Sequence, residues 1–114
     1  MIGVKPKKKK ASNEPDFNLG EGQAAIYGKV TERNIWDNSI TDAMNVEVSV
    51  YKNNILVGYA ITFLDGLYQI IAIDAGDNYT MTFVKNSMFT TSVFSLASKE
   101  IKEVNVELTT DDFS

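Results

Sequence analysis

The sequence predicts an all-β protein: a seven-stranded antiparallel β-sandwich that follows an extended N-terminal arm. Apolar and polar residues alternate in several short runs, which is typical of half-buried strands. Turn-forming residues separate these runs at short intervals. No stretch is strongly helical, and a series of short antiparallel strands packs as two sheets.

The arm spans residues 1–23 and precedes a sandwich domain over 24–114, which ends in a short acidic tail. The first thirteen residues contain no acid and five lysines, namely Lys5, Lys7, Lys8, Lys9 and Lys10. The whole chain carries a formal charge of −4, so the residues after 13 carry −9. Blocks of like charge with Pro and Gly rarely fold alone. We therefore interpret these lysines, with Phe17 and Leu19, as an assembly arm.

The body is expected to contain strands at 24–31, 46–51, 55–63, 67–73, 78–84, 89–96 and 101–109. After the first strand, 32–43 is a long connection, and its Ile35, Trp36 and Ile40 are expected to cap one end of the core. The Asn53-Asn54 pair and the Asp65-Gly66 pair each predict a tight hairpin turn. The strands 78–84 and 101–109 follow from alternation, as in Tyr79, Met81 and Phe83, and turn residues on both sides bound 89–96.

The order of these motifs resembles the carboxypeptidase regulatory-like family, which has a transthyretin-like, Ig-like sandwich. Ile26 to Val30 is similar to its opening strand, Asp65-Gly66-Leu67-Tyr68 to its Asp-Gly-x-Tyr turn, and Val104 to Leu108 to its closing strand. The resemblance implies structural turn and core roles for Gly28, Asp65, Gly66, Tyr68, Gly76 and Tyr79. It also implies an accessory module that binds or spaces a neighbour without chemistry or a cofactor of its own.

Composition excludes several kinds of site. The chain has no Cys and no His, so zinc sites, Cys–His or Ser–His catalysis and haem with such an axial ligand are ruled out. Asp65 lies at one end of the predicted 67–73 strand, and Asp74 and Asp77 at the other, which disfavours paired-carboxylate catalysis. Asp74, Asp77 and Asn78 offer too few oxygens for a calcium site. We expect no enzyme, no cofactor and no metal.

Two further groups of residues suggest a cross-link or a binding site, but each also has a structural explanation. Lys29 and Asn105, on the first and last strands, are candidate partners for an internal isopeptide bond, but alternation places Lys29 toward solvent. The aromatic residues Trp36, Tyr51, Tyr59 and Tyr68 could form a sugar-stacking platform. Placement in the core or at its edge is the favoured interpretation of these four.

The sequence favours a structural subunit of a large assembly, such as a phage capsid decoration protein, anchored by the arm to a protein partner. The alternative is an adhesion module for carbohydrate or a cell-surface protein. Nucleic-acid binding by the lysines is disfavoured because the rest of the chain is acidic. A small-molecule ligand and a membrane are not expected. No secretory signal follows the lysines, so the expected location is the virion or the cytoplasm of the producing cell.

Overall fold

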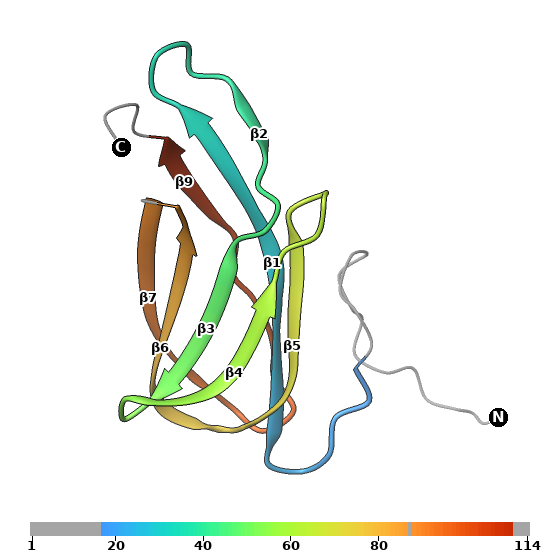
Figure 1. Ribbon diagram of the computed structural model, residues 1–114. Helices are drawn as coiled ribbons and strands as arrows, with labels where there is room; N and C mark the ends of the chain where they lie inside the picture. Colours follow the sequence, from blue (N-terminus) through green and yellow to red (C-terminus); the bar gives the residue numbers. More distant parts are fainter. Residues whose placement is uncertain (1–16, 87, 111–114) are drawn as a thin grey trace, which may run out of the picture.

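The computed structural model describes residues 17–86 and 88–110. This part of the chain contains nine strands and no helix. The strands form two sheets that face each other across one core, as Figure 1 shows. The predicted all-β sandwich is therefore confirmed. A helix that could cross a membrane does not occur among these residues.

The four-stranded sheet is antiparallel throughout, in the order β4-β3-β6-β7. Its strands are β3 (Glu47–Lys52), β4 (Ile55–Ile61), β6 (Gly76–Lys85) and β7 (Met88–Leu96). Val48, at its centre, pairs with Ala60 of β4 on one side and with Phe83 of β6 on the other. Alternate residues on β3 and β6 are buried, as the period of two requires.

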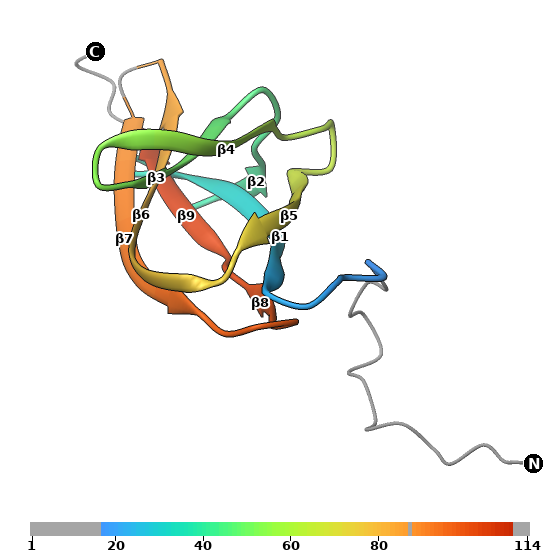
Figure 2. The same cartoon turned by 90° about the horizontal axis from the view of Figure 1, so that it is seen from below.

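The five-stranded sheet is organised around one long strand, β1 (Gln23–Asn34). Its first half lies between β5 (Leu67–Asp74), which runs antiparallel, and β8 (Ile101–Glu103), which runs parallel. Its second half lies between β2 (Ile40–Asp42), antiparallel, and β9 (Val106–Thr110), parallel. Figure 2 shows how β4 contacts β5 along one side of the sandwich, while β7 contacts β9 along the other.

The described residues form nine strands where seven were expected, because two predicted elements differ. The predicted connection 32–43 contains the end of β1 and the short strand β2. The predicted strand 101–109 is interrupted at 104–105, giving β8 and β9. Both of these pair parallel to β1, so the sheet is mixed and the expected all-antiparallel arrangement was wrong. The parallel pairing arises because the chain crosses from β7 in the other sheet before it reaches β8.

The two predicted turns have different roles. Asn53 and Asn54 both have positive φ, at 52° and 67°, and form the expected two-residue hairpin between β3 and β4. The Asp65-Gly66 turn instead joins the two sheets, because β4 pairs with β3 and β5 pairs with β1. Gly66 has φ 78°, and its carbonyl accepts a hydrogen bond from Val30 N. The expectation of a hairpin there was wrong, although the turn itself is tight.

The core is filled by residues from both sheets. Its members are Ala24, Ile26, Val30, Ala43, Val46, Val48, Val50, Tyr68, Ile70, Ile73, Tyr79, Met81, Phe83, Leu96 and Leu108. One buried polar residue, Thr62, stabilises the end of the core where the β2–β3 and β4–β5 connections meet. Its hydroxyl donates to Ala43 O at 2.6 Å and accepts from Val46 N at 3.0 Å.

Candidate functional site

The outward side of the four-stranded sheet is almost without charge. The strand register places its outward residues in three rows across β4, β3, β6 and β7: Ile61–Glu47–Val84–Phe89, Tyr59–Ser49–Thr82–Thr91 and Leu56–Tyr51–Thr80–Val93. Seven of these are apolar or aromatic, four carry a hydroxyl, and Glu47 alone is charged. We call this surface the neutral face.

The neutral face is strongly apolar at both of its outer strands. Leu56, Tyr59 and Ile61 on β4 and Phe89 and Val93 on β7 are between 46% and 74% exposed. They form two apolar strips, one on β4 and one on β7, with the inner strands β3 and β6 between them. An antiparallel sheet usually turns polar residues to water on its outer side. The exposed apolar side chains on β4 and β7 depart from this pattern.

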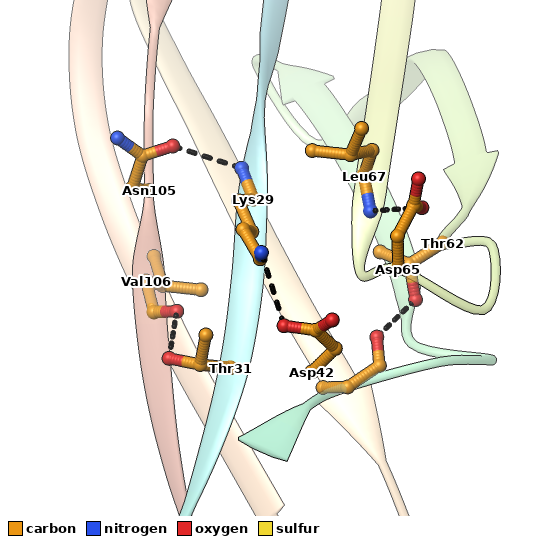
Figure 3. Close-up of polar contacts among 9 residues, drawn as sticks. Lys29, Thr31, Asp42, Thr62, Asp65, Leu67, Asn105 and Val106 are labelled. Carbon is orange, nitrogen blue, oxygen red and sulfur yellow. Dashed lines mark hydrogen bonds and ion pairs between the residues drawn. The ribbon is translucent and has the colours of Figure 1, made fainter. Parts of the chain in front are cut away.

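The outward side of the five-stranded sheet carries ion pairs, alongside exposed apolar residues of β5 such as Leu67 and Ile71. Lys29 Nζ lies 3.0 Å from Asp42 Oδ1, and Arg33 Nε lies 2.6 Å from Glu107 Oε2. Figure 3 shows the Lys29–Asp42 pair reaching from β1 to β2. An open groove of about 760 Å³ runs across this side, lined by residues that include Tyr27, Gln69 and Glu103. We call this surface the polar groove.

The break between β8 and β9 shapes the polar groove. Here Val104 N donates to Tyr27 O at 2.9 Å. Figure 3 shows the second contact, in which Asn105 Oδ1 accepts from Lys29 N at 2.8 Å. The Asn105 side chain thus satisfies the β1 backbone where the strand pairing is interrupted. A Cβ on Gly28 would lie 1.9 Å from Val104 O, so this close approach requires glycine.

Two buried tyrosines tie neighbouring elements together by their hydroxyls. Tyr68 Oη donates to Val104 O at 2.6 Å, and Tyr79 Oη donates to Asp74 O. Burial raises the pKa of Tyr68 well above its ordinary value, with a smaller contribution from the charge of Glu103. Burial also raises the pKa of Tyr79, with a further contribution from Asp74. Both hydroxyls are therefore structural donors that stay protonated at neutral pH.

The other residues of the implied turn-and-core set are Asp65, which lies in a turn, and Gly76, which lies at the start of a strand. Asp65 Oδ1 accepts a hydrogen bond from Leu67 N at 3.2 Å (Figure 3). Gly76 opens β6, where an added Cβ would lie 2.6 Å from Lys52 Nζ. Asp65 and Asp74 lie at opposite ends of β5 and cannot act as a pair. Within the described residues, no three acidic side chains gather as they would around a metal ion.

The aromatic residues do not behave as one group. Tyr68 is buried, but Trp36 in the β1–β2 turn is 65% exposed, and Tyr59 is half exposed on the neutral face. The expectation that Trp36 and Tyr59 belong to the core or its edge was wrong. Ile35 and Ile40 are also exposed, so the predicted cap over the core does not form. The β1–β2 hairpin extends past the core instead of folding over it (Figure 1).

The remaining residues singled out from the sequence are the isopeptide candidates and the arm. The backbone N–H of Lys29 donates to the side-chain Oδ1 of Asn105, while the Lys29 ammonium points to Asp42 (Figure 3). Phe17 and Leu19 are half-buried. The five arm lysines and the acidic residues of the C-terminal tail lie outside the described residues.

Sequence reasoning missed the neutral face, although its signal is present in the alternating residues. In β3, buried Val48 and Val50 alternate with Glu47, Ser49 and Tyr51. The corresponding outward residues of β6 and β7 are Thr or apolar, not Lys or Glu. Only the strand order reveals that these positions share one surface.

Fold and site define the chain as a small all-β domain of two packed sheets. No protein-family model matches its sequence, and a comparison with curated proteins finds no match. Among solved structures, a 9R-lipoxygenase from Cyanothece PCC8801 is similar over 92% of this chain, with 12% sequence identity and a TM-score of 0.47. The chain spans 18% of the length of that lipoxygenase.

Proposed function

We propose that this protein is a non-enzymatic assembly subunit that docks on another protein surface through its neutral face. The observation that carries the proposal is the contrast between the two outer sides of the sandwich. One side carries ion pairs, as the surface of a domain in water does. The other presents apolar and hydroxyl side chains with a single carboxylate.

Composition and resemblance agree with this proposal. The absence of Cys and His removes the commonest nucleophile–base pairs. Similarity of the motif order to carboxypeptidase regulatory-like domains supports an accessory role, because such domains bind or space a neighbour. A decoration-type subunit of a large particle, such as a phage capsid, fits a compact sandwich with a basic arm that contacts an acidic protein surface.

Loss of incorporation into the assembly tests the proposal. Val93→Glu places a charge on the most exposed apolar residue of the neutral face. Ile71→Glu is the matched control, since it adds the same charge at a half-exposed apolar residue of β5 in the other sheet. We expect Val93→Glu to remain unbound when the assembly is sedimented, while Ile71→Glu co-sediments. Equal incorporation of both variants would remove the neutral face from the proposal.

An adhesion role is the second candidate, and the polar groove favours it. Tyr27 and Gln69, with Asn105, present a ring and two amides in one open depression, which is a lining that suits a sugar. Glycan-array binding that Tyr27→Ala and Gln69→Ala abolish would favour this role. Binding that is indifferent to both substitutions would exclude the groove as its site.

A further inference from the structure

Resting on the proposed docking role of the neutral face, we infer that this face first binds a second copy of the same chain. Two sandwiches would pack neutral face to neutral face as a two-fold dimer. The dimer would be the unit that the arm then brings to a larger assembly.

The area of the neutral face suits a dimer. Its five exposed apolar side chains are flanked by half-buried or exposed Thr and Ser residues and by Tyr51, Val84 and Glu47. The whole face offers roughly 900 Å², and a standard protein–protein interface buries about 800 Å² on each partner. Aligned sheets pack face to face about 10 Å apart, with strand directions within about 30° of each other, so much of this face can be covered at once.

Charge also favours a second copy. The residues after 13 carry −9, so two copies repel each other wherever their acidic surfaces meet. The neutral face is a place where they can meet without that repulsion, because Glu47 is its one charged residue. Depletion of charge at the centre of a contact is typical of protein interfaces.

The layout of the neutral face complements itself under a two-fold rotation. Bulky apolar residues lie on the outer strands β4 and β7, while Ser49, Thr80 and Thr82 lie on the inner strands β3 and β6. An axis parallel to the strands turns β4 of each copy onto β7 of the other. Leu56 then faces Val93, Ile61 faces Phe89, and Ser49 faces Thr82. The rotation preserves the rows, so Tyr59 of one copy lies opposite Thr91 of the other, and Glu47 faces β6 instead of Glu47.

Pairing of two copies along the free edge of β4 is the competing arrangement. An irregularity in the β3–β4 register between Val50 and Tyr51 leaves Val57 without a partner on β3. Bulges of this kind twist an edge strand away from further pairing. Val93 lies on β7, at the opposite edge of the sheet. A substitution at Val93 should therefore disrupt face-to-face packing but not pairing along β4.

Sedimentation equilibrium of the full chain tests the inference. We expect the wild-type chain and Ile71→Glu to show the mass of two chains at tens of micromolar, with the same midpoint. Tyr59→Glu and Val93→Glu should each raise the dimer dissociation constant at least tenfold, with circular dichroism unchanged. A wild-type chain that stays monomeric at every concentration overturns the inference. A dimer that survives Val93→Glu also overturns it, in favour of the β4 edge.

Disulfide formation provides a second test, because the chain contains no Cys. A mixture of Tyr59→Cys and Thr91→Cys chains should form mixed disulfides, while Tyr59→Cys mixed with Gln69→Cys should form few. Equal yields would contradict the two-fold arrangement. Failure of the dimer remains distinguishable from failure of the proposed function. A monomeric wild-type chain whose incorporation is still lost in Val93→Glu would leave the docking role intact without a second copy.

Discussion

Single residues join the two halves of the five-stranded sheet at one point. Gly28 allows Val104 to approach β1, Asn105 accepts from the backbone of Lys29, and Tyr68 donates to the Val104 carbonyl. Each group satisfies another that the break between β8 and β9 would leave unpaired. A net hydrogen bond contributes about 0.5–1.5 kcal/mol, so these contacts help to hold β8 and β9 against β1.

Tyr68 makes stability depend on pH in the alkaline range. Because its pKa is raised in the fold, the folded chain holds this proton more tightly than the unfolded chain does. Its contribution is complete below the ordinary tyrosine pKa of about 10 and is lost as the pH rises above it, by about 1.4 kcal/mol per pH unit. Urea unfolding at pH 8 and pH 11 should show a smaller loss in Tyr68→Phe than in the wild-type chain. An equal loss in both would mean that the Tyr68 proton is not held by the fold.

Gly28→Ala tests the close approach at the strand break. The added Cβ would overlap Val104 O, and backbone on both sides leaves little freedom to yield. We expect a loss of about 3 kcal/mol in the free energy of unfolding. Gly20→Ala is the control, because its Cβ would make an ordinary contact of 3.4 Å with Gln23. Two equally stable variants would show that the strands do not approach at Gly28.

At the scale of elements, alternation and turn residues predicted most of the strands but not their partners. Residues such as Val48 and Val50 identify a strand with one buried side, whichever strand lies beside it. The two halves of the last predicted strand look alike in sequence, and Asn105 reads as one more outward residue between Val104 and Val106. Its role at the break depends on Gly28 and Lys29, which are 77 and 76 positions away in the chain. The neutral face was not predicted because only the strand order brings its rows, which are far apart in the sequence, onto one surface.

The two turns offer a matched comparison. Gly66 has φ 78°, and a Cβ there would lie 2.4 Å from Val30 O, so Gly66→Val should cost on the order of 1–3 kcal/mol or more. Asn54 also has positive φ, which Gly adopts readily, so Asn54→Gly should change stability by less than about 0.5 kcal/mol. Chemical unfolding of both variants measures the difference. A stable Gly66→Val chain would contradict the turn between the sheets.

At the scale of the whole molecule, charge is divided among three regions. The lysines of the arm carry +5, the outer side of the five-stranded sheet carries paired charges, and the neutral face carries almost none. This division suits the regions to partners of different character. The arm suits an acidic partner, and the neutral face suits an apolar one.

Replacement of Lys7, Lys8, Lys9 and Lys10 by Gln tests the role proposed for the arm. Because each exposed ionic contact contributes about 0.2–1 kcal/mol, the fourfold change should weaken incorporation into the assembly measurably. The melting temperature should stay nearly constant, since the core lies in the sandwich. Added salt should weaken incorporation of the wild-type chain more than that of the variant. Normal incorporation of the variant at every salt concentration would show that the arm lysines take no part in binding.

The most direct test of the central claim is whether the neutral face is covered when the protein is in its assembly. Val93→Cys and Ile71→Cys each introduce a single thiol, one on the neutral face and one on the other sheet. In dilute, isolated protein both should react rapidly with a maleimide. In the assembly, we predict that the Val93→Cys thiol is protected at least tenfold, while the Ile71→Cys thiol reacts as before. Equal reactivity of the Val93→Cys thiol in the two states would contradict the claim.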